Sequence, residues 1–108
     1  MSVQTTGYVM IGKYYKEAPF DYEDEKVEEL MCRGGAGNMA IVGVEPMSDS
    51  SVVIGKILAQ HDMGDEGLTV IDFDYNRESI QTAIIEMCID GVECLLDDIK
   101  IYAWTCYH

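Results

Sequence analysis

The chain has 108 residues, of which 20 are Asp or Glu and 7 are Lys or Arg, which gives a formal net charge of −13 with both histidines neutral. Its length fits one domain, residues 1–108, and a hydrophobic fraction of 48% supplies a core and argues against a disordered chain. The negative charge disfavours direct binding to nucleic acid or to an anionic membrane surface, because both are bound by Lys and Arg.

The first predicted elements are a strand and an acidic helix. Residues 8–15 (YVMIGKYY) are rich in β-branched and aromatic side chains, which is typical of a strand. Residues 21–33 (DYEDEKVEELMCR) place Val27, Leu30 and Met31 at i, i+3 and i+4, the spacing of one apolar face on a short helix. Acidic residues crowd the first turns of this helix, where they meet the positive end of the helix dipole.

A glycine-rich loop and a second strand follow. Residues 39–45 (MAIVGVE) predict a buried strand that Pro46 ends, because proline does not donate a hydrogen bond to a sheet. The loop at 34–38 opens the pattern G-x-G-x-x-A. Because this loop follows a predicted helix and leads into a strand, the pattern does not indicate a dinucleotide site.

Residues 52–61 (VVIGKILAQH) fit two structures. Apolar residues recur at helical spacing, but three β-branched residues in a row followed by Gly55 weaken a helix. We therefore expect a strand here, followed by a hairpin loop and a further strand at 68–75 (LTVIDFDY). The residues of the competing helical stripe are Val53, Ile54, Ile57 and Leu58.

The C-terminal part predicts a helix and a last strand. Asn76 is a suitable N-cap for a helix at 77–90, and Gly91 stands where a glycine often ends a helix. Residues 99–106 (IKIYAWTC) predict a strand.

The elements together predict an α+β domain. Their order is β-α-β-β-β-α-β, with a mainly antiparallel sheet of about five strands and two helices. If residues 52–61 are helical, the order becomes β-α-β-α-β-α-β, which is typical of a small parallel α/β unit.

Two groups of possible metal ligands lack the spacing of a known metal site. Asp72, Asp74 and Asn76 match the opening D-x-D-x-N of a calcium loop, but Arg77 and Ala83 stand where that loop needs Gly and Glu. The second group gathers in one predicted loop without a fixed ligand pattern. We predict neither a metal nor a cofactor. The residues of the second group are His61, Asp62, Asp65 and Glu66.

The cysteines predict a reduced, cytoplasmic chain. They form no C-x-x-C pair, and the first ten residues lack the basic and apolar regions of a secretion signal. No apolar run approaches the 18 or so residues that span a membrane. We therefore expect free thiols that are mostly buried as small hydrophobic side chains. The four residues are Cys32, Cys88, Cys94 and Cys106.

The densest negative charge lies at residues 17–29, which hold seven carboxylates and one lysine, Lys26. Opposite potentials speed encounter, so a basic protein is the favoured partner. Tyrosine beside carboxylates suits a surface that grips Arg and Lys, because tyrosine is favoured at the centres of interfaces. The predicted partner-binding residues are Asp21, Tyr22, Glu23, Asp24, Glu25, Glu28, Glu29, Asp72 and Asp74.

These observations lead to the hypothesis of a non-enzymatic inhibitor, an acidic module that blocks a basic, nucleic-acid-processing protein such as a nuclease. An immunity protein, or a phage anti-defence protein such as an anti-CRISPR that mimics nucleic acid, acts in this way. Charge and size carry this analogy, and no motif identifies a family. Two alternatives are a structural or assembly subunit of a virion or larger complex, and a small metal-dependent enzyme or ligand sensor.

Overall fold

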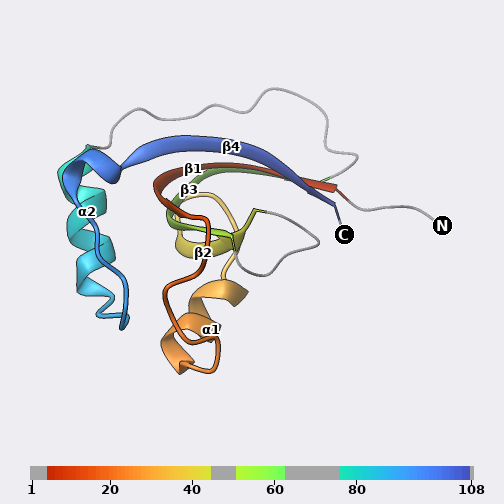
Figure 1. Ribbon diagram of the computed structural model, residues 1–108. Helices are drawn as coiled ribbons and strands as arrows, with labels where there is room; N and C mark the ends of the chain where they lie inside the picture. Colours follow the sequence, from red (N-terminus) through yellow and green to blue (C-terminus); the bar gives the residue numbers. More distant parts are fainter. Residues whose placement is uncertain (1–4, 45–50, 63–75, 108) are drawn as a thin grey trace.

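The computed structural model describes residues 5–44, 51–62 and 76–107 (Figure 1). In these residues four strands form one antiparallel sheet in the order β2-β3-β1-β4, accompanied by two α-helices. The predicted α+β class is confirmed, and the predicted strand at 68–75, which carries Asp72 and Asp74, lies outside the described residues. The elements are β1 (Thr5–Tyr15), α1 (Glu25–Cys32), β2 (Met39–Gly43), β3 (Val52–Asp62), α2 (Arg77–Glu86), the 3₁₀ turn η1 (Leu96–Asp98) and β4 (Lys100–Tyr107).

The ambiguous segment at 52–61 is a strand, and the helical alternative is wrong. β3 lies between β2 and β1 and pairs with both in antiparallel register. Its β-branched residues Val52, Val53 and Ile54 are all buried, because the two faces of the strand pack against two different apolar clusters. A residue run that is apolar on both sides fits a central strand better than a one-sided helix.

β1 and β3 approach each other most closely where two glycines face each other. Gly12 pairs with Gly55. A Cβ on Gly12 would collide with the carbonyl oxygen of Ile54, and a Cβ on Gly55 would collide with that of Ile11. Only glycine fits at both positions, because only glycine lets two backbones come this close.

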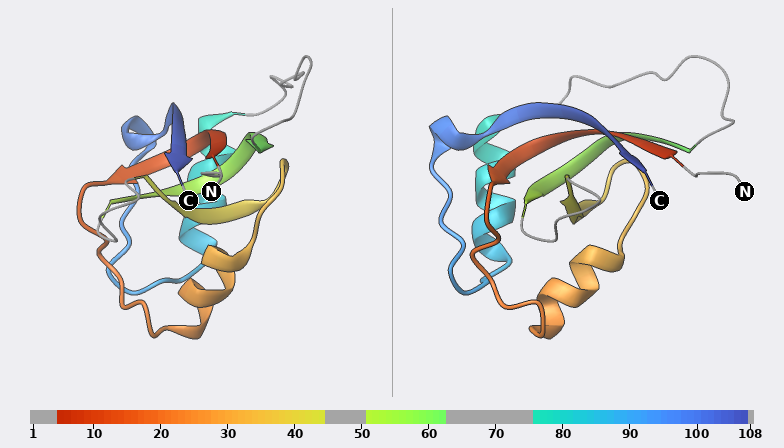
Figure 2. Two further views of the ribbon diagram at one scale, coloured as in Figure 1. Left: turned by 90° about the vertical axis from the view of Figure 1, so that its right-hand side faces the viewer. Right: turned by 45° about the vertical axis from the view of Figure 1, so that its right-hand side comes forward.

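The helices cover one face of the sheet (Figure 2). Buried side chains of α1 and α2 pack there with β1, β2 and β3 in one apolar cluster. The central members from the helices are Val27 and Leu30 of α1 and Ile80 and Ile84 of α2.

The opposite face has a second, smaller core, because the sheet curls. In a flat sheet the edge strands β2 and β4 would lie three strand spacings apart, about 14 Å. Instead, the Trp104 indole Nε1 of β4 donates a hydrogen bond to the Gly43 carbonyl oxygen of β2 over 3.2 Å. The Trp104 ring also stacks on Tyr8, with ring centroids 5.4 Å apart. The side chains enclosed by this curl include Met10, Val53 and Ile57, all fully buried.

Both helices are shorter than predicted, for different reasons. α1 begins at Glu25 rather than at residue 21, because the Asp21 carboxylate accepts a hydrogen bond from the backbone N–H of Glu23 over 2.9 Å and forms a turn. The helix N-cap is Asp24, whose carboxylate accepts from the backbone N–H of Lys26 over 2.9 Å.

α2 confirms the predicted N-cap but not the predicted end. The Asn76 side chain accepts a hydrogen bond from the backbone N–H of Ser79 over 2.7 Å. The helix ends at Glu86 rather than at residue 90, because Cys88 adopts a left-handed conformation with φ of 52°. Gly91, with φ of 86°, forms a later turn of the loop instead of the helix end.

Candidate functional site

The acidic residues of α1 face away from the core. Val27 and Leu30 are 0% and 7% exposed, and this fixes which side of the helix turns inward. Glu25, Glu28 and Glu29 lie on the other sides and are exposed. The helix therefore holds three of the predicted partner-binding residues on its outer surface.

The turn before α1 adds the other described residues of the predicted site. The Phe20 ring is buried, and the Tyr22 ring packs edge-on against it with ring centroids 5.4 Å apart. Tyr22 is 38% exposed, and the carboxylates of Asp21 and Glu23 are exposed beside it. Phe20 thus anchors a short segment in which a tyrosine and carboxylates lie together at the surface.

The predicted carboxylates divide into those with a local structural role and those without one. Asp21 and Asp24 bind backbone N–H groups, and the Glu29 carboxylate pairs with the Arg33 guanidinium over 2.8 Å. The carboxylates of Glu23, Glu25 and Glu28 make no hydrogen bond or ion pair with the described residues. Within the described part of the predicted site, these three carboxylates are therefore the ones most open to a cation on a partner.

The structure adds acidic residues that the sequence analysis missed. The loop after α2 lies against the segment that leads into α1, because Gly91 packs on the carbonyl oxygen of Pro19. The Lys26 ammonium also donates to the carbonyl oxygen of Cys88 over 3.5 Å. This loop and the end of α2 carry three further exposed carboxylates. They are Glu86, Asp90 and Glu93.

We use the term acidic end for the exposed carboxylates of residues 17–29 together with Glu86, Asp90 and Glu93. Figure 1 shows α1 and the lower end of α2 on the same side of the sheet. Only the fold brings the two groups together, since about 60 residues separate them and no local pattern in the sequence relates them. Asp72 and Asp74, the last two predicted site residues, lie outside the described residues.

Hydrogen bonds from β1 hold the loop of the acidic end in place. The Lys13 ammonium and the Tyr15 hydroxyl both donate to the carbonyl oxygen of Glu93, over 2.6 and 2.7 Å. Lys13 also pairs with the Asp98 carboxylate over 3.2 Å, and its ammonium lies 4.8 Å from the centre of the Tyr15 ring. These contacts fix the Glu93 backbone, so the Glu93 carboxylate projects from an anchored loop.

The same contacts shift the titration of the groups involved. The backbone N–H of Leu95 and then the Lys13 ammonium hold the pKa of Asp98 below its ordinary value. Burial acts to lower the pKa of Lys13, but the hydrogen bond to Asp98 and the attraction of Tyr15 outweigh it, so the pKa of Lys13 is raised. Burial raises the pKa of the Tyr15 hydroxyl and of the Cys94 thiol. All four groups stay in their ordinary charge states at neutral pH, which suits a structural contact rather than acid–base catalysis.

The cysteines differ from the prediction in one respect. Cys32, Cys88 and Cys94 are free thiols, but only Cys94 is buried. Cys32 stands at the outer side of the end of α1, and Cys88 lies in the turn after α2. The expectation of mostly buried cysteines is therefore wrong for Cys32 and Cys88, because both helices end at the surface.

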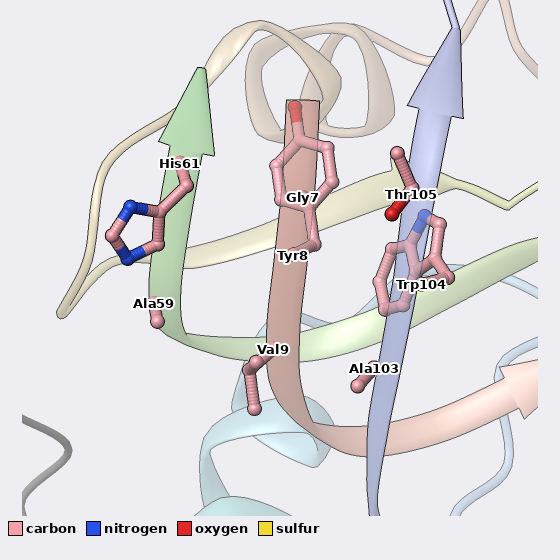
Figure 3. A pocket seen from close by; sticks show the side chains of 8 residues that line it. All are labelled: Gly7, Tyr8, Val9, Ala59, His61, Ala103, Trp104 and Thr105. Carbon is pink, nitrogen blue, oxygen red and sulfur yellow. The ribbon is translucent and has the colours of Figure 1, made fainter. Parts of the chain in front are cut away.

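A shallow depression crosses the sheet at the end away from the helices (Figure 3). It has a volume of about 360 Å³ and is lined by residues of β1, β3 and β4. His61 on β3 and Thr105 on β4 lie on opposite sides of it, and Gly7 on β1 lies between them. Among the side chains that the structure describes, no carboxylate or cysteine lines this depression.

The part of the chain that the structure describes holds neither a cluster of metal ligands nor a membrane-spanning helix. No three His, Cys, Asp or Glu side chains gather closely enough there to hold a metal ion. Neither α-helix in these residues has the length and apolar character that crossing a membrane requires.

Comparison of the chain with known protein families, curated proteins and solved structures finds no match.

Proposed function

We propose that the protein is an acidic binding module that blocks a basic, nucleic-acid-processing protein through its acidic end. The observation that carries this proposal is the set of exposed carboxylates on α1 and in the turn before it, of which Glu23, Glu25 and Glu28 form no ion pair with the described residues. A surface of unpaired carboxylates attracts a Lys- and Arg-rich surface and speeds its encounter. Lys- and Arg-rich surfaces are the ones that bind the phosphates of nucleic acid.

The support around these carboxylates suits recognition. α1 is held by two buried side chains and by the Asp24 N-cap, and the loop that carries Glu93 is held by Lys13 and Tyr15. Charges on anchored elements lose less conformational freedom when a partner binds than charges on a loose chain. Tyr22, 38% exposed beside the carboxylates, offers an aromatic contact to a partner's Arg or Lys.

The mechanism we propose is blocking by charge and shape. The acidic end occupies the basic surface on which the partner binds nucleic acid, and the rest of the domain then excludes the nucleic acid sterically. Because the contact is dominated by exposed charges, its strength falls as salt screens them over about 8 Å at physiological ionic strength.

Capture from a lysate of the native host tests this proposal. The tagged chain is immobilised, incubated with the lysate at low salt and washed with rising salt. We expect a basic nucleic-acid-processing protein to elute with salt and its activity on nucleic acid to fall when purified chain is added. Capture of an acidic protein, of a partner whose activity is unchanged, or of the chain alone would contradict the proposal, and self-capture would favour an assembly subunit.

A further inference from the structure

Two exposed aliphatic side chains lie beside the acidic end. Leu95 is 68% exposed and Ile85 is 56% exposed, the two largest values among the large hydrophobic side chains that the structure describes. Ile85 directly precedes Glu86 on α2, and Leu95 follows Glu93 by two residues. The acidic end therefore borders apolar side chains whose burial against a partner would be favourable.

A hydrogen bond places Leu95 on the same side of α2 as Ile85. The Gln81 side-chain Nε2 donates to the carbonyl oxygen of Cys94 over 3.1 Å. Gln81 and Ile85 stand at i and i+4 on α2, so they lie on one face of the helix. Figure 1 shows the loop after α2 running back along this helix. We use the term apolar border for Ile85 and Leu95, because both belong to this surface.

Leu95 is presented on an anchored backbone. Its N–H donates to the Asp98 carboxylate over 3.0 Å, and that carboxylate pairs with the Lys13 ammonium of β1. The carbonyl oxygen of the preceding residue, Cys94, accepts the hydrogen bond from Gln81. A side chain on a fixed backbone loses less conformational freedom when a partner binds. The exposure of Leu95 thus belongs to a held surface rather than to a loose loop.

The charge along the segment that carries the apolar border is entirely negative. Residues 78–99 contain six carboxylates and no Lys, Arg or His. Positive charge begins only at the two ends of this segment, at Arg77 beside Glu78 and at Lys100 after η1. The cations of a partner are therefore attracted to the side of the apolar border that faces the acidic end. An acidic partner, or a second copy of this chain with its charge of −13, is repelled there.

We propose that the apolar border receives an apolar side chain of the basic partner, flanked in that partner by Lys or Arg side chains that reach the acidic end. This inference rests on the proposed function and adds the kind of segment recognised, a cationic amphipathic segment rather than a uniformly charged one. Charge complementarity selects this occupant, and an apolar contact bordered by charged groups is the usual arrangement of a protein interface. The carboxylates speed association, whereas the apolar contact slows dissociation.

Two synthetic peptides of equal length and equal positive charge test the inference on the full chain. One peptide contains Lys and Leu in an amphipathic order, and the other has Ser in place of each Leu. Titration calorimetry at physiological and at higher salt gives the dissociation constant of each peptide. We expect the Lys–Leu peptide to bind about tenfold more tightly, because it buries apolar surface that the Lys–Ser peptide lacks. Salt should weaken the binding of both peptides but leave this ratio largely intact, because screening acts on the charges.

Two isoleucines of similar exposure supply the variant and its control. Ile85→Ser should remove most of the preference for the Lys–Leu peptide. Ile101→Ser should keep the full preference, because Ile101 is 52% exposed on β4 but follows Lys100 rather than standing beside a carboxylate. Leu95→Ser tests the same surface if Ile85→Ser does not fold, and we expect the same loss.

The outcomes separate this inference from the proposed function. Equal affinity for the two peptides, with binding that salt weakens, overturns the inference and leaves the proposed function standing. Equal effects of Ile85→Ser and Ile101→Ser on the preference also overturn the inference. If neither peptide binds even at low salt, the acidic end attracts no cationic partner, and the proposed function fails together with the inference.

Discussion

The sheet and the acidic end differ in how closely they are packed and in how they use charge. The four strands contain only four charged residues, Lys13, Lys56, Asp62 and Lys100, and glycines bring two of the strands into backbone contact. Residues 17–29 alone contain seven carboxylates. The difference indicates that the sheet specifies and stabilises the fold, whereas the acidic end is the surface through which we propose that the chain recognises a partner.

A larger side chain at the contact between Gly12 and Gly55 should reduce the stability of the sheet more than any other change considered. Gly12→Val adds a side chain where even a Cβ collides with the backbone of Ile54. We expect the free energy of unfolding to fall by about 3 kcal/mol, the upper range for overpacking. Urea unfolding followed by circular dichroism measures the loss. Gly43→Ala is the control, because a Cβ at Gly43 meets nothing within 4 Å. Equal stability of Gly12→Val and the unaltered chain would contradict the close approach.

Trp104→Phe should have the next largest effect. It removes the hydrogen bond to the Gly43 carbonyl oxygen and reduces the stacked area on Tyr8, while it keeps an aromatic ring in the second core. The expected loss in the free energy of unfolding is about 1–2 kcal/mol, from one hydrogen bond and part of one aromatic contact. Thermal unfolding measures it, and an unchanged melting temperature would mean that Trp104 does not hold the two edges of the sheet together.

The ion pair between Lys13 and Asp98 joins the sheet to the loop of the acidic end, and the pH dependence of stability tests it. The pKa of Asp98 is lowered in the folded chain from an ordinary value of 3.8. Its ionised carboxylate therefore adds to the free energy of unfolding above pH 3.8, and this addition is lost as the pH falls through the lowered pKa. Asp98→Asn lacks this contribution at every pH. The difference in unfolding free energy between the two chains should therefore be constant near neutral pH and should shrink below about pH 4. A difference that grows on acidification would contradict the Lys13–Asp98 contact.

Charge reversal at the acidic end should affect stability least. Glu25→Lys with Glu28→Lys loses favourable charges in the first turn of α1 but lowers the net repulsion of the chain. Each lost charge costs about 0.3–1 kcal/mol at a helix N-terminus, and the reduced repulsion offsets part of it. We expect a net change below about 1 kcal/mol in urea unfolding at physiological salt. A loss as large as that of Gly12→Val would show that α1 carries the fold rather than a free surface.

The sequence predicted the elements with strong local patterns. Runs of β-branched residues correctly predicted the strand at 52–61 and, with the other strands, the α+β class. A polar residue just before a helical apolar pattern correctly predicted Asn76 as the N-cap of α2. Element ends were less accurate where a side chain competed with the helix. Asp21 forms a turn that delays α1, and left-handed Cys88 ends α2 early, although cysteine has no known preference for that conformation.

The candidate site was predicted only in its local part. Charge density along the chain located the carboxylates of residues 21–29, and the structure places those on α1 at its outer surface. Glu86, Asp90 and Glu93 join them only because Gly91 packs on Pro19 and Lys13 binds the Glu93 backbone. Contacts between residues this far apart leave no periodicity in a single sequence. The curl of the sheet through Trp104 was missed for the same reason.

The most direct test of the account compares two charge reversals of equal size in partner binding. Glu25→Lys with Glu28→Lys alters the acidic end, and Glu78→Lys with Asp97→Lys makes the same change of charge in the first turns of α2 and η1. The measurement is the association rate and affinity of each variant for the partner captured from the host, at physiological salt. We predict a loss of at least about tenfold for the first variant, mainly through slower association, and little change for the second. Equal losses for both variants, or no loss for the first, would contradict the assignment of the acidic end as the binding surface.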